Sequence, residues 1–160
     1  MTTDTRYKIP RSVLVVIHTP DLQTLLIERA DDEGRASGVW QSVTGSLDFE
    51  GESWLDCAAR EVLEETGLDV NSPGHDLTDW RLENTYDIWP HYLHRYAPGI
   101  TRNTERVLGL CIPNPVRVQL APREHVNQMW LPWEVAALKV RSASNEAAIR
   151  RLDFLSVLGV

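Results

Sequence analysis

The sequence predicts an α/β fold in which a mixed β-sheet is packed between helices. Extended, β-branched segments are interleaved with a few helical ones along the chain, and short turn signals join some of them. Such a pattern is typical of a sheet whose faces are covered by helices. The 160 residues, of which 42% are apolar, are enough for one domain with its own core. We therefore expect a single domain over residues 1–160.

The predicted strands are short segments rich in β-branched and aromatic residues. Pro20-Asp21 supplies a turn between the first two, and a polar loop of Asp, Gly and Ser follows over residues 30–38. In chain order, the strands are predicted over residues 12–18, 24–29, 40–44, 80–89, 91–96, 106–112 and 126–131.

The clearest helix is predicted over residues 53–66. Ser53 is a suitable N-cap with Asp56 three residues later, and Gly67 stands where a left-handed residue ends a helix. An apolar face that packs on the sheet is predicted from Leu55, Ala58, Ala59 and Val62. Two more helices are predicted over residues 133–140 and 145–155.

The charge and the cysteines narrow the classes of function. A net charge of −7 argues against binding nucleic acid through the overall field, and a polyphosphate substrate would need metal ions or local cations. Cys57 and Cys111 do not form a disulfide framework and are expected to be buried thiols. The apolar run at residues 13–17 is too short for a membrane or signal segment. We expect a cytoplasmic protein without a membrane partner, and the oligomeric state stays open.

The predicted helix carries a set of carboxylates. At about 100° per residue, Glu61, Glu64 and Glu65 fall on one helix face. One interpretation is a solvated acidic face, in which Arg60 pairs with Glu64 at i,i+4. The other is a site for a hard cation such as Mg²⁺, which prefers oxygen ligands. The carboxylates by themselves leave both interpretations open.

Spaced residues around these glutamates carry a resemblance to a known family. They are Gly45, Glu52, Arg60-Glu61-Val62, Glu64-Glu65 and Gly67-Leu68. This set, over residues 45–68, resembles the Nudix box of diphosphate-cleaving hydrolases. The resemblance implies a Nudix-type α/β/α sandwich and a pyrophosphohydrolase that depends on Mg²⁺, with Mn²⁺ as an alternative. One departure is an extra residue between Gly45 and Glu52, which can shift the Gly45 carbonyl.

Segments outside the box are similar to one branch of the family. Members of that branch remove pyrophosphate from 7,8-dihydroneopterin triphosphate in folate biosynthesis and leave the monophosphate. The similar segments are Tyr7-Lys8, residues 12–17, Arg29 with Asp31-Asp32, residues 40–45, residues 94–99, residues 101–105 and Ser144-Asn145. The resemblance therefore implies a small pterin triphosphate as substrate.

The resemblance also implies roles for individual residues. The metal ligands would be Glu61, Glu65 and Glu124, together with Gly45. The catalytic residues would be Glu64, Glu124 and Arg60, with either glutamate as the candidate base. The substrate contacts would be Lys8, Arg29, Thr44, Tyr86, Asp87, Ile88, Trp89 and Ser142.

These residue types suit the hydrolysis of a phosphoanhydride. The reaction needs charge neutralisation, an oriented water and a base for its proton. A divalent metal on the carboxylates would neutralise phosphate oxygens and lower the pKa of bound water. Lys8 and Arg29 can hold terminal phosphates. Trp89 or Tyr86 can stack on a flat pterin.

Other polar and aromatic residues also have structural interpretations. Arg29 or Trp89, taken alone, could be a surface charge or a core residue. We predict packing roles for Trp40, Trp130 and Trp133. His91 and His94 would face opposite sides of an extended segment, which favours structural roles for both. Arg95 and Arg102 are further candidate cations, although Arg102 could instead pair with Glu105.

Two other functions compete with the pterin assignment. A nucleoside triphosphate pyrophosphohydrolase, for example one that prefers dATP, would use the same helix and metals with different ring contacts. A non-catalytic nucleotide-binding module of the same fold would be expected to have lost residues of the box. Because Arg60, Glu61, Glu64 and Glu65 are all present, we favour an enzyme.

Overall fold

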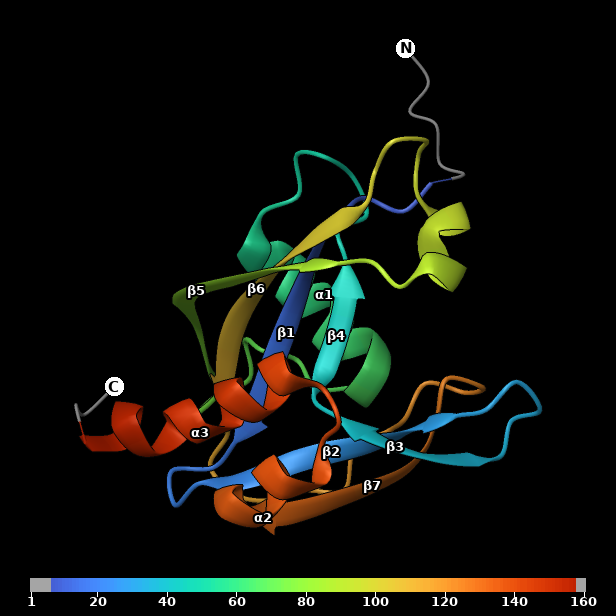
Figure 1. The fold of residues 1–160 in the computed structure, drawn as a ribbon. Helices are drawn as coiled ribbons and strands as arrows, with labels where there is room; N and C mark the ends of the chain where they lie inside the picture. Colours follow the sequence, from blue (N-terminus) through green and yellow to red (C-terminus); the bar gives the residue numbers. More distant parts are fainter. Residues whose placement is uncertain (1–6, 158–160) are drawn as a thin grey trace.

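A computed structural model describes residues 7–157 and arranges them as a sheet with helices on both faces (Figure 1). The elements in chain order are β1 (Arg11–His18), β2 (Gln23–Ala30), β3 (Ala36–Gln41), β4 (Val43–Ser46), α1 (Trp54–Thr66), β5 (Asp76–Asp87), the 3-10 helix η1 (Pro90–Arg95), β6 (Arg102–Cys111), β7 (His125–Pro132), α2 (Trp133–Lys139) and α3 (Ala143–Val157). The ends of the predicted domain, residues 1–6 and 158–160, lie outside the described residues.

The strands form one mixed sheet with β1 at its centre. The strand order is β3-β2-β1-β6-β5, with β4 also paired to β1 and β7 to β2. β1 and β6 run parallel, and the other pairs are antiparallel. In this register, Ser12 of β1 lies between Ser46 of β4 and Glu105 of β6.

Alternating residues of β1 supply two separate cores, one on each face of the sheet. Val13 and Val15 pack with residues of α1, whereas Leu14 and Val16 pack with residues of α2 and α3. This alternation follows from the two-residue period of a strand. Figure 1 shows α3 crossing the sheet on the viewer's side and α1 behind it. The predicted α/β/α sandwich is therefore confirmed.

The predicted ends of α1 are confirmed. The Asp56 backbone N–H donates to the Ser53 hydroxyl at 3.0 Å, and Gly67 adopts a left-handed φ of 72°. The buried face is narrower than predicted: Leu55 is exposed and Ala59 is half-buried, whereas Ala58 and Val62 are buried. Cys57 is buried, as expected. The sheet covers a narrower stripe of the helix than its apolar residues indicate.

Three predictions about the strands were wrong. Residues 91–96 form the 3-10 helix η1 instead of a strand, because Pro90 has no N–H for a sheet and suits the first position of a helix. The predicted strand at 40–44 is divided at Ser42 into β3 and β4, and β3 takes the end of the predicted loop. β5 begins at Asp76, before the predicted residue 80.

Because residues 90–95 form a helix, two histidines are arranged differently from the prediction. His91 and His94 were expected to face opposite sides of a strand, but residues three apart lie on the same side of a 3-10 helix. The packing roles predicted for three tryptophans are confirmed. Trp130 packs against the core beside α1, and Trp40 and Trp133 pack against the core beside α2 and α3. No helix among residues 7–157 is long and apolar enough to span a membrane.

Candidate active site

Arg60 joins the loop before α1 to the glutamates of the helix. Its guanidinium donates to both carboxylate oxygens of Glu52, at 3.0 and 2.9 Å, and to the Ser46 carbonyl at 3.0 Å. It also donates to Glu61 Oε1 at 2.8 Å. The predicted pair with Glu64 is present but is longer, at 3.6 Å. The extra loop residue therefore leaves Arg60 bonded to both ends of the loop.

Glu61 packs directly against the backbone of Gly45. A Cβ atom at Gly45 would overlap the Glu61 carboxyl group, so only glycine leaves room for this glutamate. Burial raises the pKa of Glu61 to about 7, although the hydrogen bond and charge of Arg60 oppose the shift. The Gly45 carbonyl accepts a weak contact from the Cys57 thiol at 3.9 Å.

Glu65 is a buried carboxylate with unused hydrogen-bonding capacity. It is 6% exposed, and its Oε2 atom has no hydrogen-bond partner among the described residues. The Thr44 backbone N–H hydrogen-bonds to the carboxylate. Burial, together with the charges of Glu61 and Glu124, raises the pKa of Glu65 to about 8. A buried group of this kind needs a partner that stabilises negative charge.

Strand pairing brings Glu124 to the helix from a distant part of the chain. The Ala30 N–H at the end of β2 donates to the Glu124 carbonyl at 2.9 Å, and β7 then continues along β2. Donor atoms of Glu65, Glu124 and His125 all lie within 4.8 Å of one another. The first two belong to the predicted metal set.

His125 is a member of this group that the sequence reasoning missed. It is 7% exposed, and neither ring nitrogen has a hydrogen-bond partner within residues 7–157. Burial and the charge of Arg29 lower its pKa to about 4, which keeps the ring neutral and its nitrogen able to accept. Its position directly after Glu124, at the start of a strand, was the available signal.

The donor set fits a divalent cation. Ligands of one octahedral ion at roughly 2.1 Å lie about 3 to 4 Å apart, and the donor atoms of this group lie within 4.8 Å of one another. The unpartnered Oε2 of Glu65 and the neighbouring carboxylates provide the negative charge such an ion requires. Glu61 and Glu64 lie outside this group of three: Glu61 is half-buried against Gly45, and Glu64 is exposed.

Positively charged side chains lie beside the glutamates. The pKa of Lys8 is lowered by partial desolvation and by the charges of Arg95 and Arg29, while Glu61 opposes the shift. Arg29 also acts electrostatically on Glu65 and on His125. Two predicted substrate contacts, Lys8 and Arg29, are thus brought to the glutamates, as is the backbone of Thr44.

The predicted contacts at residues 86–89 have different environments. Trp89 is 68% exposed and leads into η1, whereas Ile88 is buried. The Tyr86 hydroxyl accepts a hydrogen bond from Asn103 at 2.9 Å. Asp87 forms an exposed ion pair with Arg102 at 3.2 Å, so the suggested pairing of Arg102 with Glu105 was wrong.

Ser142 lies at the start of α3. Its hydroxyl accepts from the Asn145 N–H at 3.3 Å and lies 2.9 Å from the Ser144 hydroxyl. Asn145 in turn accepts from the Ser42 N–H at 2.9 Å, and its amide donates to the Ser42 hydroxyl at 2.8 Å. The start of α3 is thereby fixed over the junction of β3 and β4.

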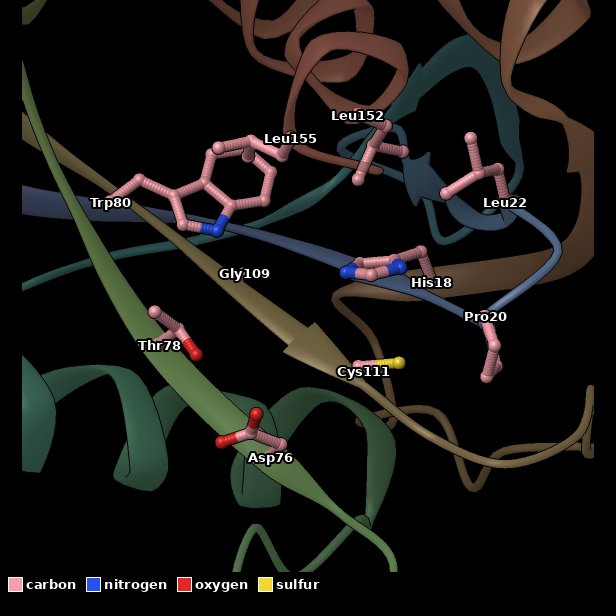
Figure 2. A pocket seen from close by; sticks show the side chains of 10 residues that line it. All are labelled: His18, Pro20, Leu22, Asp76, Thr78, Trp80, Gly109, Cys111, Leu152 and Leu155. Carbon is pink, nitrogen blue, oxygen red and sulfur yellow. The ribbon is translucent and has the colours of Figure 1, made fainter. Parts of the chain in front are cut away.

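A hollow elsewhere on the molecule is separate from these residues. Its volume is about 260 Å³, and Figure 2 shows side chains from β1, β5 and α3 around it, including His18, Trp80 and Leu152. None of the predicted site residues lines it. The glutamates and cations described above therefore define the candidate active site.

The fold and this arrangement of glutamates define a class of protein, and the chain belongs to it: residues 8–152 match the NUDIX domain family. Dihydroneopterin triphosphate diphosphatase of Escherichia coli strain K12 is 41% identical over 149 residues, covering 92% of this chain and 95% of that protein. The protein of the same name from Haemophilus influenzae is 34% identical over 152 residues, covering 93% and 90%.

A solved structure agrees with these relatives. The E. coli dihydroneopterin triphosphate pyrophosphohydrolase is 40% identical to this chain and superposes with a TM-score of 0.79. The superposition covers 91% of this chain and 95% of that one. The predicted resemblance to the Nudix family is confirmed.

Proposed function

We propose that this chain hydrolyses 7,8-dihydroneopterin triphosphate to the monophosphate and pyrophosphate with a divalent metal ion, Mg²⁺ or Mn²⁺. The relatives named for this substrate, which align with nearly the whole chain, support the choice of substrate. For the chemistry, the observation that carries the proposal is the buried Glu65 carboxylate beside Glu124, because its Oε2 has no hydrogen-bond partner among residues 7–157. The predicted cytoplasmic location and the single domain over residues 1–160 stay predictions.

We propose that Glu61, Glu65 and Glu124 hold the metal, with Gly45 and His125 as neighbouring donors. A bound divalent ion supplies charge neutralisation and a water of lowered pKa. Lys8 and Arg29 lie beside these carboxylates, so they would bind the phosphates of an anionic substrate. This answers the need for local cations in a protein of net charge −7.

We propose a positioning role for Arg60 and assign the base to a glutamate. Arg60 donates to Glu52 and Glu61 and so orients the carboxylate that faces Gly45. Glu64 is exposed and lies outside the donor group, so its carboxylate is available to accept the proton of an attacking water. Glu124 is the alternative base. Because Glu124 is also a proposed metal ligand, the deciding variant is Glu64→Gln: at saturating metal its kcat should fall strongly if Glu64 is the base and stay near the wild-type value if Glu124 is.

The first experiment is the release of pyrophosphate from 7,8-dihydroneopterin triphosphate, dATP and GTP, with and without Mg²⁺ or Mn²⁺. We expect release that depends on the metal and a kcat/KM highest for the pterin. Equal or higher values for dATP would retain the Nudix chemistry but replace the substrate with a nucleoside triphosphate. No release from any of the three would contradict the proposed function and favour a binding module.

A further inference from the structure

A second polar region is buried on the other face of the sheet, under the start of α3. Asn103 and Glu105 of β6 are 2% and 6% exposed, and both point to this face with their neighbours on β1 and β5. We call this region the strand cluster. It consists of Ser12, Asn84, Tyr86, Asn103, Glu105 and Ser144.

The strand cluster has spare hydrogen-bond acceptors. The Asn103 amide nitrogen donates to the Ser12 hydroxyl at 2.8 Å and to the Tyr86 hydroxyl at 2.9 Å, so both of its N–H groups are used. Its carbonyl oxygen and Oε1 of Glu105 have no hydrogen-bond partner in the described part of the chain. A buried acceptor without a partner is costly, and here two such residues share one face of a strand.

The carboxylate of Glu105 is held in place by neutral groups. The side chains of Ser144 and Asn84 hydrogen-bond to it, and its burial raises its pKa. Ser144 belongs to the start of α3, which Asn145 fixes against Ser42. Ser144 of the helix therefore orients the Glu105 carboxylate, and Oε1 of that carboxylate has no hydrogen-bond partner among the described residues.

Contacts connect the strand cluster with the candidate active site. Tyr86, at the outer end of the cluster, is 41% exposed and interacts electrostatically with Glu105 and Tyr96. The backbone of Tyr96 pairs with that of Lys8 in an isolated β-bridge, and the charge of Lys8 interacts with Glu61. A substrate with its phosphates near Lys8 can therefore extend its ring toward Tyr86 and the cluster behind it.

We propose that Asn103 and Glu105 bind the edge of the substrate's ring and determine which ring is accepted. The proposal rests on the proposed function. A 2-amino-4-oxo ring, as in pterin and guanine, presents a ring N–H beside an exocyclic amino group, which matches two acceptors. Adenine presents a ring acceptor in that position, so it would leave the acceptors of the cluster opposed by another acceptor. Binding requires the exposed Tyr86 to release Asn103.

Glu105→Gln tests the proposal, because it keeps the shape but replaces one acceptor oxygen with a donor. Steady-state kcat/KM would be measured for 7,8-dihydroneopterin triphosphate and for dATP. We expect the ratio of pterin to dATP to fall at least about tenfold, since a hydrogen bond to a charged group is replaced by opposed donors. An unchanged ratio, or an equal fall for both substrates, would overturn the inference.

GTP and ITP provide a second arm, since they differ only by the 2-amino group. The wild-type protein should prefer GTP, and Glu105→Gln should remove that preference; a preference that survives the substitution counts against the inference. This ratio is informative even if the pterin is a poor substrate, so failure of the proposed function is distinguishable from failure of the inference.

Two further variants complete the design. Glu146→Gln on α3 changes an exposed glutamate that pairs with Arg150, and it should leave every ratio at the wild-type value. If a thermal melt shows that Glu105→Gln does not fold, Ser144→Ala removes a hydroxyl that hydrogen-bonds to Glu105 and lies 2.9 Å from the Ser142 hydroxyl. It should lower the pterin-to-dATP ratio about threefold; a wild-type ratio would contradict the proposal.

Discussion

The glutamates of α1 and the strand cluster both bury a carboxylate, but on opposite faces of one sheet and in opposite company. Each carboxylate, Glu65 and Glu105, has one oxygen without a hydrogen-bond partner in the described chain. Glu65 is surrounded by the charges of Glu61 and Glu124, and Glu105 by the neutral side chains of Ser144 and Asn84. Repelling carboxylates call for a cation, whereas a single carboxylate among neutral groups suits a hydrogen-bond donor.

The largest effect on activity should come from the glutamates of α1. Glu65→Gln keeps the shape but removes a proposed metal ligand, so kcat should fall at least about a hundredfold, roughly 2.7 kcal/mol of barrier. The fall should be the same for pterin and nucleotide substrates, unlike that of Glu105→Gln. Steady-state kinetics at saturating Mg²⁺ measure it, with Glu146→Gln as the control. A twofold loss would remove Glu65 from the metal site.

Arg60 stabilises the loop before α1 and its contact with Glu61. Arg60→Ala leaves the buried Glu52 without its cation and frees the Ser46 carbonyl, so unfolding should become easier by about 2 kcal/mol. Denaturant melts measure this change. The matched control is Arg150→Ala, which breaks an exposed i,i+4 pair with Glu146 and should cost under about 0.5 kcal/mol. Equal costs for the two variants would show that Arg60 does not fix the loop.

Substitution of a residue proposed to contact the substrate's ring should change KM rather than the dependence of the rate on metal. Trp89 is exposed beside the predicted ring contacts, so Trp89→Ala should raise KM for the pterin substrate about five- to tenfold by removing a stacking surface. The Mg²⁺ concentration for half-maximal rate should change less than twofold. If both quantities change equally, Trp89 does not stack on the ring.

A separate effect is the pH dependence of stability without metal. The pKa values of Glu61 and Glu65, about 7 and about 8, lie above the ordinary carboxyl value. The folded protein therefore binds protons that the unfolded chain has released, and its unfolding free energy falls as pH rises from about 4.5 through 8. Thermal melts should show Tm decreasing over this range.

Two comparisons check the cause of that decrease. Mg²⁺ or Mn²⁺ should raise Tm more at about pH 8 than at about pH 5, because the metal replaces the bound protons. Glu65→Gln, which cannot titrate, should flatten the profile. A Tm that is independent of pH in the wild-type protein would contradict the raised pKa values.

Local sequence signals predicted part of the site well. The capped helix, the position of its glutamates and the alternation of β1 are set by neighbouring residues and by the periods of helix and strand. Where the prediction failed, tertiary context decided: Pro90 started η1 in place of a strand, and the sheet left Leu55 exposed. The wider family resemblance, outside the box, supplied Glu124, which no local spacing connects to α1.

The sequence by itself determined the family, through motifs spread along the chain. It also determined the capped helix and the glutamates of α1, because these depend on residues within a few positions of one another. Only the tertiary structure brought His125 beside Glu65, Asn103 beside Ser12, and Glu105 beside Ser144 of α3. Those placements depend on the register between β2 and β7 and on how α3 crosses the sheet. Strand pairing and helix packing join distant segments, so the spacing of residues along the chain does not contain them.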